Sequence, residues 1–259
     1  MIKKFLLICF AVIVALFSCI SPTTDFQYTN DSPGISDGSL QNQKDKTKGQ
    51  DDYALLVKMK QDFEKQKKIN SDTHAWMNIP NIGYYPVMFD NETSFYLSHG
   101  ADKKPLVRGA LFMSPASKGT LDDTCLIYGH HMKSGAMFGS LKKYKDSLFL
   151  QKNKPIILYD GKQYSVYQPY SSFEIQDGKE FVNQGPWVNA ANREKYMKSI
   201  WKRSIAKTKT GFQPNFGNNM LFLQTCDYDF KNARLVIAST EIQKIQDPAP
   251  QNIKIKTIS

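Results

Sequence analysis

The sequence predicts a mainly β domain with helical insertions, folded as a barrel or a sandwich. Three observations predict this class. Short runs of apolar, β-branched and aromatic residues alternate with turn formers along most of the chain. Only two long stretches, residues 51–70 and 187–207, carry apolar side chains at helical spacing. Asp160 and Gly161 separate two strand-like runs, which is a strong hairpin signal.

The N-terminal segment has the composition of a secretory signal. Residues 1–20 carry two lysines ahead of an apolar run at residues 5–17. This run is short for a membrane span, which requires about 20 apolar residues. It is either an uncleaved anchor or, because residues 16–19 resemble a lipobox, a lipoprotein signal lipidated at Cys19. Both alternatives predict a domain tethered outside the membrane.

Changes in composition divide the rest of the chain into three segments. Residues 21–50 are polar and have too few apolar side chains to offset their ordering entropy, so a flexible linker is expected. Residues 51–245 hold the folded domain, which opens with an amphipathic helix. Residues 246–259 are expected to form a polar tail.

The folded domain contains further strand signals between its two helices. The expected strands and short helical pieces follow one another at residues 74–89 (two strands around a turn), 95 (a helical piece), 109–113, 125–128, 137–141 (a helical turn), 155–159 and 163–170. The last pair of strands contains the apolar triplets 221–223 and 235–237. Pro186, just before the second long helix, suits a helix start.

Charge and cysteine content exclude several classes of protein. The net charge is +10, but the lysines are scattered, which indicates a solvated basic surface rather than a nucleic-acid groove. The four cysteines form no CxxC pair, so a zinc ribbon or a thioredoxin-type site is not supported. Within the domain, Cys125 and Cys226 form either one disulfide or, as we favour, one buried structural thiol and one reactive thiol.

The candidate site centres on the connection between the last two strands. Cys226 ends one core strand, and Arg234 opens the next strand eight positions later. A thiol at a rigid strand end beside a permanent cation suits a cysteine nucleophile and its oxyanion. Asp227 and Asp229 lie between them and suit either a turn or the orientation of a histidine.

The histidines supply the candidate acid or base. Only His130 and His131 follow an apolar strand and a glycine, whereas His74 and His99 are expected at the surface or in loops. The histidine precedes the cysteine, which disfavours papain-like enzymes. A zinc site of His130, His131 and Cys226 is disfavoured because adjacent strand residues point to opposite faces.

Several motifs together resemble the class B sortases. The motif YGHHM at residues 128–132 is followed by MFGSL, and TCDYDFKNAR occupies residues 225–234. The resemblance extends to WMNIP at 76–80, PVM at 86–88 and FYLSHGADKK at 95–104, and so spans most of residues 50–240. It implies a cell-surface transpeptidase of Gram-positive bacteria with an eight-stranded β-barrel, N-terminal helices and a long helix before the cysteine strand.

The resemblance implies a role for each matching residue. Cys226 is expected to attack the threonine carbonyl of a sorting signal, His130 to protonate the leaving amine, and Arg234 to stabilise the oxyanion. Tyr128, Gln224 and Thr225 are candidate substrate-binding residues; Gln224 departs from the serine frequent in the family. An NPQTN-like signal, a peptidoglycan amine as acceptor, and no cofactor or metal are expected.

Two other functions remain open from the sequence. A membrane-tethered binding module could retain the barrel without catalysis, which the departure at Gln224 would suit. A hydrolase could instead release the cleaved signal to water.

Overall fold

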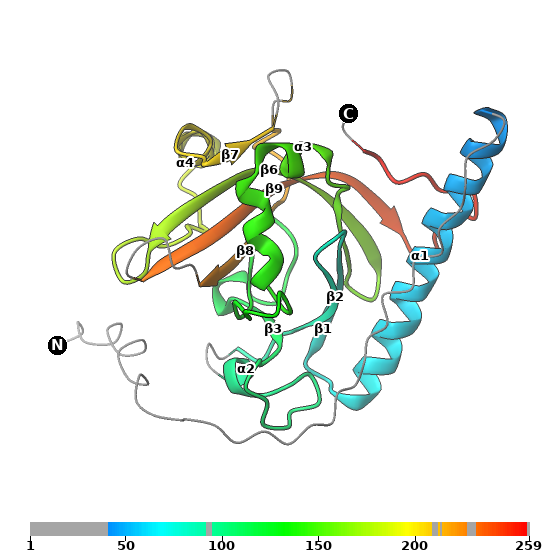
Figure 1. Cartoon of the computed structure of the whole chain (residues 1–259), viewed down its shortest axis with the longest axis horizontal. Helices are drawn as coiled ribbons and strands as arrows, with labels where there is room; N and C mark the ends of the chain where they lie inside the picture. Colours follow the sequence, from blue (N-terminus) through cyan, green and yellow to red (C-terminus); the bar gives the residue numbers. More distant parts are fainter. Residues whose placement is uncertain (1–40, 92–94, 209–211, 213, 227–231, 258–259) are drawn as a thin grey trace.

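The computed structural model describes residues 41–91, 95–208, 212, 214–226 and 232–257, with the side chains of residues 41–47 and of Cys226 outside the described part. The predicted mainly β fold with helical insertions is confirmed (Figure 1). Its strands are β1 (Thr73–Ile79), β2 (Gly83–Met88), β3 (Leu111–Met113), β4 (Thr124–Tyr128), β5 (Ile156–Tyr159), β6 (Gln163–Gln176), β7 (Ala206–Lys207), β8 (Met220–Cys226) and β9 (Ala233–Gln246).

Eight of these strands close into a barrel. They pair in the order β5-β1-β2-β3-β4-β8-β9-β6, and an additional β5–β6 pairing completes the ring. The short strand β7 pairs with β6 outside the ring. Closure removes the exposed edges that an open sheet would present. The eight-stranded barrel implied by the family resemblance is therefore confirmed, and the alternative of a sandwich is excluded.

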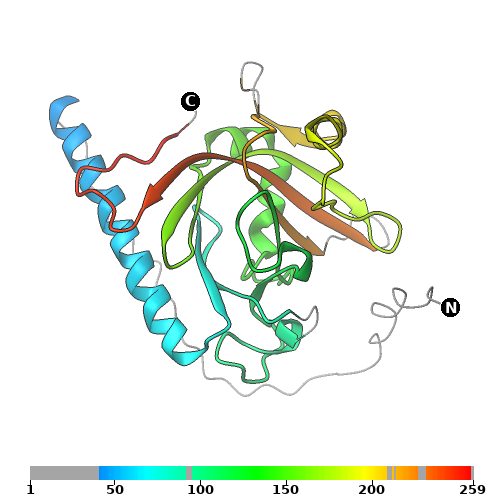
Figure 2. The same ribbon diagram turned by 180° about the vertical axis from the view of Figure 1, so that it is seen from behind.

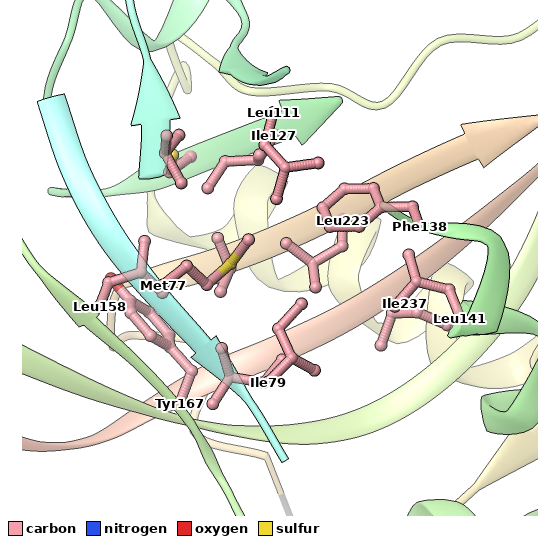
Figure 3. Packing of buried hydrophobic residues seen from close by; sticks show 14 of the residues in the cluster. Met77, Ile79, Leu111, Ile127, Phe138, Leu141, Leu158, Tyr167, Leu223 and Ile237 are labelled. Carbon is pink, nitrogen blue, oxygen red and sulfur yellow. The ribbon is translucent and has the colours of Figure 1, made fainter. Parts of the chain in front are cut away.

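The barrel interior is filled by every second residue of its strands. Because strand side chains alternate between faces, one set points inward and the other packs outside. Figure 3 shows part of the inward set, which includes Met77, Leu158, Leu223 and Ile237. All four are fully buried. On β8 the intervening Phe222 belongs instead to a cluster on the outer face.

The outer cluster is covered by helix α4 (Ala190–Lys202), which was expected to span residues 187–207. The helix begins later because the side chain of Asn189 caps it, accepting a hydrogen bond from the backbone N–H of Asn192 at 2.9 Å. It ends earlier because the chain extends into β7, which pairs with Ser171 and Ser172 of β6. Met197 and Ile200 bury the apolar face of the helix.

Helix α1 (Gln41–Ile69) covers the opposite side of the barrel and begins ten residues before the expected start at residue 51. The C-terminal tail lies beside its first half (Figures 1 and 2). The backbone N–H of Ile255 donates to Asp52 at 2.9 Å, and Ile255 is buried in one cluster with Leu56. Residues 41–50, expected in the flexible linker, thus form the first turns of α1. The expected polar tail packs on the helix.

Short helical segments fill the connections around the barrel. These are α2 (Phe95–Ser98), the 3-10 helices η1 (Pro115–Ser117) and η2 (Gly139–Lys145), and α3 (Ser147–Lys152). Within the described residues, no helix combines the length and apolarity needed to cross a bilayer. The apolar run at residues 5–17 lies outside the described residues.

Candidate active site

Cys226 and Arg234 are brought together by the β8–β9 hairpin. They form the last register pair of its antiparallel ladder, next to the pair of Thr225 and Leu235. Opposite residues in such a ladder have Cα atoms about 4.5–5.5 Å apart. The expected juxtaposition of cysteine and arginine is therefore present in the backbone. Asp227 and Asp229 lie outside the described residues.

His130 reaches the same end of the barrel through the parallel pairing of β4 with β8. Tyr128 is the register partner of Gln224, and the Gly129 N–H donates to the Gln224 carbonyl at 3.2 Å. Continuing this register by two residues along both strands places His130 opposite Cys226. Neighbouring strands lie about 4.8 Å apart. The strand order β4-β8-β9 thus puts the histidine, cysteine and arginine positions in one row.

Gly129 is required where β4 ends. A Cβ at this position would lie 2.4 Å from the Leu111 side chain and 2.7 Å from the ring of Phe138. Both neighbours are buried in the barrel core, so neither has room to move away. Glycine therefore lets the backbone that carries His130 pass close to the core.

The His130 ring is held by the main chain of α2. Its Nε2 lies 2.7 Å from the Leu97 carbonyl oxygen, and the ring is half-buried. A carbonyl oxygen can only accept, so Nε2 must carry a proton. The neutral ring then has its lone pair on Nδ1, and only Nδ1 is available for proton exchange.

The Arg234 guanidinium is fixed on two sides. Its Nη2 donates to Oδ2 of Asp177 at 2.7 Å, and its Nη1 donates to the Ala233 carbonyl at 3.1 Å. Asp177 directly follows β6, whose residue Ile175 is the register partner of Arg234. This carboxylate was missed by the sequence analysis, because an aspartate followed by Gly178 in a polar stretch indicates only a turn.

The three candidate substrate-binding residues lie in two different environments. Tyr128 and Gln224 are half-buried neighbours on β4 and β8. Thr225 is buried, and among the residues that the structure describes its hydroxyl has no hydrogen-bond partner. It pairs with Leu235, whose side chain lies in the barrel interior. The structure thus groups Tyr128 with Gln224 and leaves Thr225 on the other face.

Tyr128 packs on an aromatic neighbour and keeps its phenolic proton. Its ring packs on Phe112 with centroids 5.3 Å apart. Burial raises the pKa of the Tyr128 phenol, the Ser114 hydrogen bond opposes this shift, and the Asp177 charge adds to it. Tyr128 therefore stays protonated at neutral pH and remains a hydrogen-bond donor.

The connection from β6 to α4 is anchored to the barrel near Tyr128. The Gln184 amide bridges two serines of the β3–β4 connection: its Nε2 donates to Ser114 at 3.0 Å, and its Oε1 accepts from Ser117 at 2.7 Å. Val182 is buried, whereas the neighbouring Phe181 is 76% exposed. The two hydrogen bonds of Gln184 thus hold the β6–α4 connection against the barrel, and this connection exposes the aromatic side chain of Phe181.

Cys125, His74 and His99 have structural surroundings. Cys125 is a free, fully buried thiol in the barrel core, as expected for a structural cysteine. His74, expected at the surface or in a loop, instead lies half-buried in β1 with its Nε2 bonded to the Gly119 carbonyl. His99 bonds through Nδ1 to the Phe95 carbonyl at 2.9 Å.

Comparison with known proteins agrees with this architecture. The sortase domain family matches residues 77–242. Sortase B of Listeria monocytogenes is 24% identical over 188 residues, which cover 69% of this chain and 73% of the relative. Sortase B of Staphylococcus aureus is 24% identical over 187 residues, which cover 70% and 75%. The X-ray structure of Clostridium perfringens sortase B is 30% identical, with a TM-score of 0.63 and coverage of 70% of this chain and 99% of that chain.

The matched segment extends from β1 into β9 and contains every position of the row described above. The chain therefore belongs to the sortase family. Its relatives place it among the class B sortases, which are cysteine transpeptidases. The resemblance drawn from the sequence motifs is confirmed.

Proposed function

We propose that this chain cleaves a C-terminal sorting signal after threonine and transfers the surface protein to an amino group of a cell-wall precursor. The observation that carries the proposal is the row of His130, Cys226 and Arg234 at one end of adjacent strands. It unites a nucleophile, an acid–base group and a permanent cation, the three components that acyl transfer through a thiol requires.

Acylation uses all three residues. The Cys226 thiolate attacks the threonine carbonyl carbon, and Arg234 stabilises the resulting oxyanion through its N–H donors. The peptide C–N bond then breaks, and protonated His130 gives its Nδ1 proton to the leaving amine. The products are a thioester at Cys226, a free C-terminal fragment and neutral His130. The Leu97 carbonyl holds Nε2 throughout, so that the ring keeps its orientation.

Deacylation reverses the proton movement. An amine attacks the thioester, His130 accepts a proton at Nδ1, and the thiolate leaves as the new amide bond forms. Tyr128 and Gln224 are proposed to contact the signal, which is expected to be NPQTN-like, and the position of Thr225 suits a supporting role instead.

The cellular setting is proposed from the sequence. Residues 1–20 would tether the chain to the membrane, residues 51–245 would carry catalysis on the extracellular face, and the partners would be surface proteins and a peptidoglycan amine.

The experiment uses the full chain, a peptide ending in an NPQTN-like signal, and triglycine as acceptor. Mass spectrometry should detect the ligated peptide and its thioester at Cys226. Cys226→Ala should abolish both without unfolding the domain, whereas the matched control Cys125→Ala should retain them. Release of the acid alone despite added amine would favour the hydrolase. Absence of both products and thioester would favour a binding module.

A further inference from the structure

Asp177, the carboxylate that pairs with Arg234, lies on a hydrogen-bonded stretch of backbone. Its backbone N–H donates to the Asn232 carbonyl at 2.9 Å, which extends the β6–β9 ladder by one residue. The Gln176 carbonyl then accepts from Lys179 and Glu180 at 3.0 and 2.9 Å, closing a tight turn. Hydrogen bonds on both sides of Asp177 therefore fix the backbone from which its carboxylate reaches Arg234.

The Arg234–Asp177 pair is more protected from water than the pair that Glu180, on the same connection, forms with Arg203 at the end of α4. The side chains of Arg234 and Asp177 are 18% and 20% exposed, with a separation of 2.7 Å. Arg203 and Glu180 are 36% and 47% exposed, with a separation of 3.1 Å. Partial burial strengthens a charge-assisted hydrogen bond, whereas exposed pairs contribute little.

We propose that Asp177 is a positioning residue for Arg234, holding the guanidinium so that its remaining N–H donors are aimed along the end of β8. This inference rests on the proposed function of Arg234. Arginine has many rotamers, and the anchor removes that freedom before substrate arrives. Anchoring Nη2 on Asp177 and Nη1 on the Ala233 carbonyl uses two of five donors and fixes the plane of the fork.

The same carboxylate connects the arginine to the candidate substrate-binding side of the site. Burial raises the pKa of the Tyr128 phenol, and the charge of Asp177 acts in the same direction. Tyr128 is on β4 and Asp177 follows β6, with β8 and β9 between them. Asp177 thus pairs directly with Arg234 on β9, and its charge also favours the protonated form of Tyr128 on β4.

The test compares Asp177→Asn with Glu180→Gln in the peptide ligation assay. Both changes replace an arginine-paired carboxylate in one connection by its amide, but only Asp177 contacts Arg234. A 1 Å misplacement of a catalytic group costs about 100-fold, so Asp177→Asn should lower kcat by about 10- to 100-fold with less than about threefold change in KM. Glu180→Gln should stay within about twofold of the wild type.

Two further variants separate positioning from a structural role. Asp177→Glu, which keeps the charge, should recover part of the lost kcat. In an Arg234→Lys background, Asp177→Asn should cost less than about twofold, because the fork it orients is absent. Unchanged kcat for Asp177→Asn, or equal losses in both backgrounds, would overturn the inference while leaving the proposed function intact. An inactive wild type would overturn both.

Discussion

Cys226 and Arg234 are the last register pair of the β8–β9 ladder, so the backbone itself fixes the separation of the proposed nucleophile and cation. The ladder has seven register pairs, and this pair is the seventh. The ladder also lies between β4, which leads to His130, and β6, which leads to Asp177. Side-chain changes at this pair should therefore affect chemistry far more than folding.

The first prediction concerns the shape of the cation. Arg234→Lys retains the charge but loses the planar fork that spans Asp177 and the Ala233 carbonyl. We expect kcat for peptide ligation to fall by about 100-fold, the range found when one oxyanion donor is removed. The melting temperature should change little. Kinetics with a quenched fluorescent sorting peptide would measure the effect.

Arg203→Lys is the matched control for this change. Arg203 also pairs with a carboxylate, Glu180, but more than a third of its side chain is exposed. We expect turnover within about twofold of the wild type, as is usual for exposed pairs. Near-normal turnover of Arg234→Lys would remove the arginine from the mechanism.

The second prediction concerns the tautomer of His130. Its Nε2 faces the Leu97 carbonyl, so the neutral ring should carry its proton on Nε2. His99 provides an internal control, because its Nδ1 faces the Phe95 carbonyl and its neutral ring should carry the proton on Nδ1. Long-range proton–nitrogen correlation spectra at alkaline pH distinguish the two forms. A His130 signal of the Nδ1–H type would contradict the proposed route of the proton.

Local features of the fold were predictable from the sequence, whereas contacts between distant segments were not. The β8–β9 strands and the positions of Cys226 and Arg234 were predictable, since a strand, a turn and a strand are local patterns. The early start of α1 was not, because Gly49 is buried against the carbonyl oxygens of residues 252 and 253 at the far end of the chain. The polar composition of residues 41–50 by itself predicts a linker.

The site shows the same division. No periodicity reveals that β4 pairs in parallel with β8, so the nearness of His130 to Cys226 came from the family resemblance rather than from spacing. Asp177 was missed for a related reason: it contacts Arg234 only through the β6–β9 ladder, and its sequence neighbourhood resembles any polar turn. Both contacts join residues from distant parts of the chain.

The third prediction concerns the reactivity of the two domain cysteines. Cys125 is fully buried, and burial raises the pKa of its thiol to about 12. In the native chain, iodoacetamide should therefore label Cys226 at least about 100-fold faster than Cys125. Peptide mass spectrometry reads each cysteine separately, including Cys9 and Cys19. After unfolding in urea, the two domain thiols should react at similar rates, and equal rates in the native chain would contradict the prediction.

The last prediction concerns stability and pH. His74 lies half-buried in β1 with its ring nitrogen bonded to the Gly119 carbonyl, and burial lowers the pKa of its imidazole below the ordinary value of 6.5. The unfolded chain then binds the His74 proton more readily than the folded chain, so the free energy of unfolding falls as the pH drops from 6.5 towards the folded-state pKa. His74→Gln keeps an N–H donor for Gly119 but cannot titrate. Urea unfolding at pH 7.5 and 5.5 should therefore show a smaller loss of stability in this variant than in the wild type. An equal loss in the two proteins would assign the pH dependence to other groups.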